Sequence, residues 1–91
     1  MVLNSVSDGS VIGTGTLTFD SRILGGVLVT ADGTNDATIT VQENNSDGTK
    51  VFQIVTKSPI FVAGPITIGS QAGYYSVSGT GGAAQFYEWV E

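Results

Sequence analysis

The sequence has no cysteine and no histidine among its 91 residues. The chain therefore forms no disulfide and offers no thiolate or imidazole metal ligand, and it lacks the groups for Ser-His-Asp or Cys-His catalysis and for a histidine pH switch. Charge is also scarce, because only 12% of the residues are charged and only Arg22, Lys50 and Lys57 are basic. Three scattered cations cannot neutralise a run of phosphates, and the net charge of −5 disfavours anionic lipid. We therefore expect neither nucleic acid nor a membrane as a partner.

Residues that favour helices are few as well. Leucine occurs four times and methionine once, against 13 glycines, 11 threonines, 11 valines and seven isoleucines. This composition suits strands and tight turns and excludes a helical bundle. A long apolar run is also missing, since the uncharged stretch between Lys57 and Glu88 is broken by two prolines and several glycines. It is therefore not a transmembrane segment.

What the sequence does contain is alternation of apolar and polar residues, interrupted by clusters of Gly, Asn, Asp and Ser about every 8–12 residues. The pattern predicts an all-β fold: a small antiparallel β-sandwich of about seven or eight strands, jelly-roll-like or Ig-like. We expect one domain over residues 1–91, with residues 1–10 as a candidate N-terminal arm. The expected strands are Val2–Val6, Val11–Phe19, Arg22–Ala31, Ala37–Glu43, Thr49–Thr56, Ile60–Ile68, Tyr74–Ser78 and Ala83–Val90.

Glycine and proline qualify two of these strands. Gly25-Gly26 lies inside the most apolar strand and predicts a bulge or a close approach of another backbone. Pro65 lies inside Ile60–Ile68 and predicts an edge strand or a strand split in two, since proline cannot donate to a central ladder. In the last strand, alternation places Phe86, Glu88 and Val90 on one face and Gln85, Tyr87 and Trp89 on the other.

One acidic segment has the spacing of a calcium loop. Asp32, Thr34, Asp36 and Glu43 occupy positions 1, 3, 5 and 12 of an EF-hand count. Position 6 is Ala37 instead of the glycine that the sharp turn needs, and the following residues alternate like a strand. We therefore predict a plain acidic turn and no metal.

Other signals of chemistry are weak. Gly13-Thr14-Gly15 and Gly79–Gly82 have glycine spacings of phosphate loops, but neither opens a helix or precedes a lysine. The aspartates fall almost wholly in turns, where solvent surrounds their carboxylates, whereas catalysis needs an acid that is held in an environment that shifts its pKa. We expect no catalytic residue, no cofactor and no enzymatic activity.

Aromatic residues crowd the last 18 positions, where five of them occur. Tyr and Trp are enriched at protein interfaces and in sugar-stacking sites, although one face of the last strand must also contribute to the core. The alternatives are thus a core with a partly covered sheet surface, a subunit or partner interface, and a sugar platform. The candidate interface residues are Phe86, Tyr87 and Trp89, with Val2, Leu3 and Val6 able to extend an edge by strand addition.

From Gly26 to Tyr87, roughly two-thirds of its length, the chain resembles small phage structural proteins encoded among virion genes. The matching segments are Gly26-Val27-Leu28-Val29, Asp32–Val41, Asn44-Asn45, Gly48-Thr49-Lys50-Val51, Gly73-Tyr74-Tyr75, Ser78-Gly79-Thr80-Gly81 and Phe86-Tyr87. Neither the first 20 residues nor Ser58–Ile68 has a counterpart, so these regions are candidates for a capsid-binding arm or an inter-subunit contact.

The resemblance implies a β-sandwich of the virion, located at the capsid surface as a decoration (cement) protein. Its implied partners are further copies of itself, as a homotrimer, and the major capsid protein, and it brings no catalytic residues to transfer. The alternatives are a carbohydrate-binding or tail-fibre domain and a head–tail adaptor, because each of these roles also uses small β domains.

Overall fold

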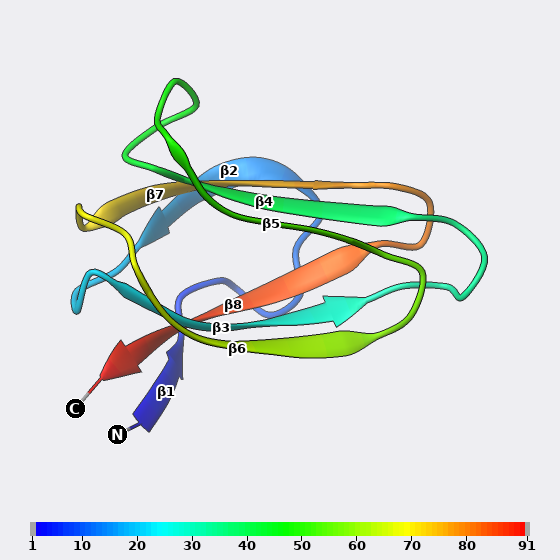
Figure 1. Cartoon of the computed structure of the whole chain (residues 1–91), viewed down its shortest axis with the longest axis horizontal. Coiled ribbons are helices and arrows are strands. Elements are labelled where there is room, and N and C mark those ends of the chain that lie inside the picture. Colours follow the sequence, from blue (N-terminus) through cyan, green and yellow to red (C-terminus); the bar gives the residue numbers. More distant parts are fainter. Residues whose placement is uncertain (1, 91) are drawn as a thin grey trace.

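The computed structural model describes residues 2–90, which form eight antiparallel strands and no helix (Figure 1). The strands are β1 (Val2–Ser5), β2 (Gly13–Thr18), β3 (Ile23–Thr30), β4 (Ala37–Glu43), β5 (Lys50–Thr56), β6 (Ile60–Thr67), β7 (Ala72–Ser78) and β8 (Ala83–Val90). The predicted all-β sandwich is therefore confirmed. No helix capable of crossing a membrane is found in this part of the chain.

Within the described chain the strands divide into two sheets of four that pack face to face (Figure 1). Sheet A has the order β1-β8-β3-β6 and sheet B the order β2-β7-β4-β5. The first strand thus pairs with the eighth, the second with the seventh, the third with the sixth and the fourth with the fifth. Such a hairpin rolled onto itself is a jelly roll, which decides between the two topologies that alternation alone leaves open.

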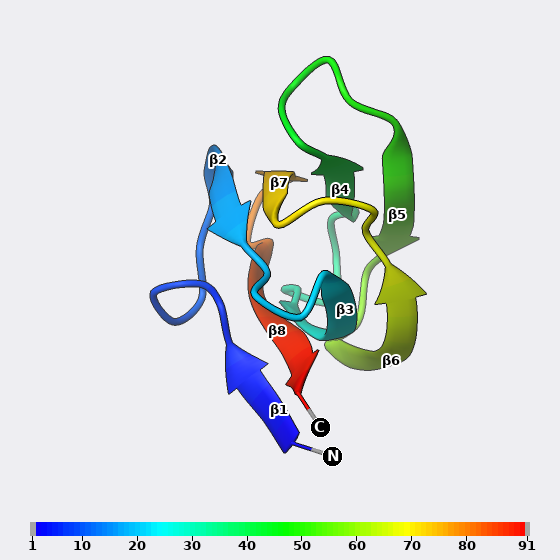
Figure 2. The same ribbon diagram turned by 90° about the vertical axis from the view of Figure 1, so that its left-hand side faces the viewer.

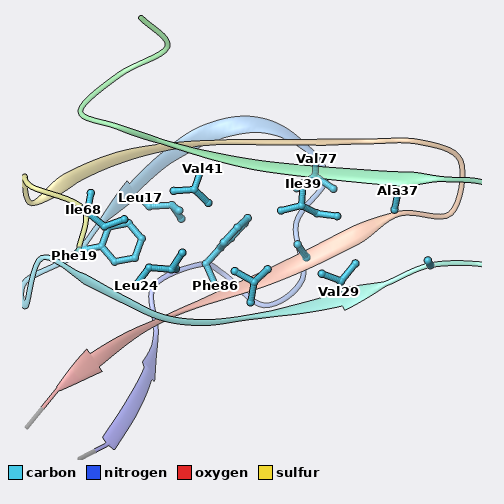
Figure 3. Close-up of a cluster of buried hydrophobic side chains, with 13 residues drawn as sticks. Leu17, Phe19, Leu24, Val29, Ala37, Ile39, Val41, Ile68, Val77 and Phe86 are labelled. Carbon is cyan, nitrogen blue, oxygen red and sulfur yellow. The ribbon is translucent and has the colours of Figure 1, made fainter. Parts of the chain in front are cut away.

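The core lies between the two sheets, where strands of both turn apolar side chains toward one another (Figure 3). Phe86 of β8 is completely buried, and its ring lies 5.4 Å, centroid to centroid, from that of Tyr75 in β7. The buried hydrophobic residues come from both sheets and from the turns beside them; they are Leu17, Phe19, Leu24, Val27, Val29, Ala31, Ala37, Ile39, Val41, Ile68, Val77, Ala84 and Phe86.

Most differences from the predicted strand bounds lie at strand ends. The expected strand Val11–Phe19 begins only at Gly13, because Val11 forms an isolated bridge to Ala84 in the opposite sheet. The expected strand Tyr74–Ser78 begins earlier, at Ala72. The sequence assigned Gly73, the next residue, to a turn, but it is buried within the strand and pairs with Leu17.

The structure confirms both the bulge predicted at Gly25-Gly26 and the edge strand predicted from Pro65. The ladders between β3 and its two neighbours both shift register between Leu24 and Gly26. Gly25 is the extra residue of a bulge against β8, whereas against β6 the extra residue lies on β6, where Gly64 and Pro65 together stand opposite Gly25. Pro65 lies in β6, which forms an edge of sheet A, where no ladder on the outer side needs its missing N–H.

The N-terminal strand extends sheet A beyond the body of the sandwich. Its four residues are all exposed, and Figure 2 shows β1 beside β8 and well away from the strands of sheet B. Val2 pairs with Val90, so the two ends of the described chain lie side by side. The loop that follows β1 is tied to β8, because the Val6 N–H donates to the Phe86 carbonyl over 2.9 Å.

Candidate functional site

Sheet A presents an outer face that is mainly apolar. Register places the side chains at alternate positions of its four strands on the side away from the core. We call this surface the apolar face, and its apolar residues are Leu3, Gly25, Gly26, Leu28, Phe61, Ala63, Tyr87 and Trp89. The uncharged polar residues Ser5, Thr30 and Gln85 also lie on it, and Gln85 Nε2 donates a hydrogen bond of 3.0 Å to Ser5 Oγ. Leu3, Leu28 and Phe61 keep 37%, 40% and 44% of their surface exposed, and the two large aromatic residues of β8 are half-buried.

Two adjacent glycines leave room on the apolar face for side chains of the neighbouring strands. A Cβ on Gly25 would lie 2.5 Å from Leu3 Cδ2, and a Cβ on Gly26 would collide with the ring of Phe61. The side chains from the edge strands β1 and β6 therefore lie down over the glycines of β3 instead of standing on the sheet. Phe61 reaches far enough to contact Tyr87 edge to face, with 6.2 Å between ring centroids and an angle of 65°.

Among residues 2–90, no charged side chain lies on the apolar face. The aspartates occupy the connections between strands, and the basic residues lie in the β2–β3 turn, in β5 and in the β5–β6 connection. Glu88 is the one acid of sheet A in this range, and it points inward, where its Oε1 accepts a hydrogen bond of 2.9 Å from the Ser21 N–H. The whole surface can therefore be covered without removing a charge from water.

The outer face of sheet B has a different chemistry. Its strands turn hydroxyl and amide side chains outward, chiefly threonine and serine, with Val55 the exposed aliphatic exception at 56%. The residues are Thr14, Thr16, Thr18, Thr38, Thr40, Gln42, Gln53, Val55, Tyr74, Ser76 and Ser78. These groups can hydrogen-bond to water, so this face is suited to solvent. Among the described residues, sheet A has the more apolar outer face of the two.

The structure separates the predicted interface residues into three groups. Tyr87, Trp89 and Leu3 lie together on the apolar face. Val2 lies on the opposite side of β1, with 56% of its surface exposed, and Val6 is half-buried against the core. Phe86 corrects the prediction, because it is 0% exposed and offers no surface to a partner. Alternation puts Phe86 on the other side of β8 from Tyr87, and the packing of the two sheets makes that side the core.

Two residues of the apolar face, Leu28 and Phe61, were not among the candidates. They come together because β6 pairs with β3, which places Phe61 directly opposite Leu28. The composition of its strand could have identified Leu28 as an outward-facing apolar residue. The run Ile23–Val29 is apolar at every non-glycine position, whereas a strand with one solvated face alternates.

The acidic segment after β3 forms a closed turn. Asp32 Oδ1 accepts hydrogen bonds of 2.8 Å from the N–H groups of Thr34 and Asn35, and Oδ2 accepts one of 2.8 Å from Asn35 Nδ2. These bonds stabilise the charged carboxylate and lower the pKa of Asp32. Nowhere in residues 2–90 do three acidic, histidine or cysteine side chains gather as metal ligands, and the same residues enclose no pocket.

Fold and surface together define the class: a jelly-roll β-sandwich that presents one uncharged, aromatic sheet face to its surroundings. No family model, curated protein or solved structure matches the chain. The resemblance of residues 26–87 to phage structural proteins therefore stays a prediction.

Proposed function

We propose that the chain is a structural protein of a phage particle, a capsid decoration protein that binds the shell subunits and further copies of itself at the capsid surface. The observation that carries this proposal is the apolar face. It brings Leu3, Leu28, Phe61, Tyr87 and Trp89 onto one surface that holds no charge among the described residues. Its role is adhesion to other proteins, without a reaction.

The energetics of adhesion agree with this role. Burying apolar surface contributes about 25 cal/mol per Å², and Tyr and Trp are the residues most enriched where proteins bind each other. A single contact of this kind is weak because association costs rotational and translational freedom. On a symmetric shell many copies bind side by side, and the effective concentration of neighbouring sites strengthens the assembly without new contacts.

Two further observations support a virion role. The rolled-hairpin strand order is shared by viral capsid domains, lectins and cupins, which is an analogy at the level of the fold. The resemblance of residues 26–87 to phage structural proteins points to the first of these groups.

The test is mass spectrometry of virus particles purified on a density gradient from the biological source of the sequence. We expect peptides of this chain in the particle fraction at a copy number close to that of the main shell subunit. A copy number far below that of the shell subunit would replace decoration by a head–tail adaptor or tail component. Complete absence from purified particles would refute the proposal.

A carbohydrate-binding domain, for example in a tail fibre, is the second candidate. The observation that favours it is the exposure of the Phe61, Tyr87 and Trp89 rings on one face, since aromatic rings stack on sugars. The chain has a single tryptophan, so titration with a glycan panel can be followed by its fluorescence. A saturable change with one glycan, abolished in Trp89→Ala, would establish this function, and a flat response across the panel would exclude it.

A further inference from the structure

The apolar face has the properties of a surface that pairs with itself. We infer that two copies of the chain stack through this face about a two-fold axis, with Leu28, Phe61 and Tyr87 in the contact. The inference rests on the adhesive role proposed above and names the partner at that same surface. A patch that contacts the same patch on another copy gives an isologous, closed pair rather than a ring, and so differs from the homotrimer that the resemblance implies.

The size of the face fits such a pair. Strands about 4.8 Å apart and about 3.3 Å per residue give sheet A, with three strands of eight residues and one of four, roughly 450 Å² in projection. The accessible area is larger than the projection because side chains rise above the backbone. Two such faces bury at least about 900 Å² together, which is the size of a weak, transient interface.

Charge also favours this face. Two chains that each carry a net charge of −5 repel each other, and the repulsion is smallest where acids are absent from the contact. Within the described residues the acids lie in loops, on sheet B or, for Glu88, inside the core, so none would be buried by stacking. Because the remaining repulsion acts through solvent, added salt screens it and strengthens the pair.

The packing of side chains also suits a sheet-on-sheet contact. Leu3 lies over Gly25 and Phe61 lies over Gly26, so the side chains of the edge strands are held against the sheet, while Leu28 and Tyr87 rise from the two central strands to meet a partner. Sheet faces pack on one another about 10 Å apart with their strands nearly aligned, as the two sheets inside a β-sandwich do. The pair would thus have four layers, with sheet A of each copy covered on both sides.

The experiment is sedimentation velocity on the purified chain over a concentration series from about 10 µM to about 1 mM, because interfaces of this size are weak. We expect a monomer–dimer equilibrium that shifts towards dimer with added NaCl. Leu28→Glu places a charge in the contact and should weaken the dimer at least tenfold. The matched control is Val55→Glu, which adds the same charge at an exposed aliphatic residue on the outer face of sheet B and should leave the dimer intact.

Two additional measurements keep the inference falsifiable. Thermal unfolding at low concentration checks that Leu28→Glu is folded. If this variant does not fold, Phe61→Glu on the edge strand β6 takes its place in the comparison. Trp89 lies on the face, so its emission should shift to shorter wavelength with concentration in the wild type and in Val55→Glu only. A wild-type monomer at every concentration, a trimer, or equal weakening by both glutamates would overturn the two-fold inference. None of these results changes the particle analysis that tests the proposed function.

Discussion

Phe86 and Tyr87 are neighbours in β8 on opposite sides of sheet A, so truncating each to alanine separates stability from association. Phe86 is 0% exposed and packs on Tyr75, whereas Tyr87 is half-buried on the outer face. Phe86→Ala leaves a cavity between the sheets, and buried Phe-to-Ala changes cost about 3–5 kcal/mol. Tyr87→Ala removes a side chain from the outer face without opening the core, and we expect about 1 kcal/mol.

The difference is large against the whole stability of the chain. At about 0.05–0.15 kcal/mol per residue, 91 residues give a free energy of unfolding of roughly 5–14 kcal/mol. Phe86→Ala therefore removes a large share of it. Since 1 kcal/mol shifts Tm by about 4–8 °C in a domain of this size, we expect a fall of at least about 12 °C, or a chain unfolded at room temperature.

The assay is thermal and urea unfolding followed by circular dichroism, with sedimentation velocity on the same samples. Phe86→Ala should lower Tm by at least about 12 °C, while Tyr87→Ala should lower it by only about 4–8 °C and lose self-association. A Tm within about 4 °C of wild type for Phe86→Ala would refute the packing argument, because that corresponds to less than about 1 kcal/mol. Equal losses of stability in the two variants would refute the assignment of the two faces.

Three further changes test other parts of the structure. Asp32→Asn should lower Tm at neutral pH, because the depressed pKa of Asp32 stabilises the folded chain at pH values above the ordinary aspartate pKa of about 4. The difference in Tm between this variant and the wild type should close as the pH falls below that value. A difference that is unchanged in acid would contradict this. Gly26→Ala should lower the free energy of unfolding by about 1–3 kcal/mol, because the new methyl group displaces the Phe61 ring. In a Phe61→Ala background the loss should be smaller, which a double-mutant cycle measured by urea unfolding would show. If the free-energy changes of the two substitutions simply add, the contact is excluded. Glu88→Ala should cost about 1–3 kcal/mol by leaving the Ser21 N–H unpaired, and Glu88→Gln should restore most of that in the same assay; equal losses would show that the hydrogen bond is unimportant.

Local patterns predicted the strands well where alternation is strong. Ala37–Glu43 and Ala83–Val90 have the bounds that the sequence indicated. The start of β7 was missed because Gly73 resembles a turn residue, yet it is required inside the strand, where a Cβ would lie 2.8 Å from the Phe19 ring. Alternation assigns residues to faces but not strands to partners, so only the observed pairing distinguishes a jelly roll from an Ig-like sandwich.

The candidate surface was predictable only in part for the same reason. Alternation placed Phe86 and Tyr87 on opposite faces of the last strand but could not say which face was the core, so both were named. Tyr87, Trp89 and Leu3 meet through pairing of the two ends of the chain. Phe61 joins them only through the ladder between β6 and β3, and no local pattern specifies that ladder.

The rolled-hairpin pairing has a consequence for how the chain folds. The strands β4 and β5 are neighbours in sequence, whereas β1 meets β8 across almost the entire chain. Closing a long loop costs more conformational entropy than closing a short one, and folds dominated by distant pairings fold slowly. Once the β4–β5 hairpin exists, however, it brings the ends of β3 and β6 together, and each further pair closes only a short additional loop. We therefore expect nucleation at the middle of the sequence, with β1 joining β8 last.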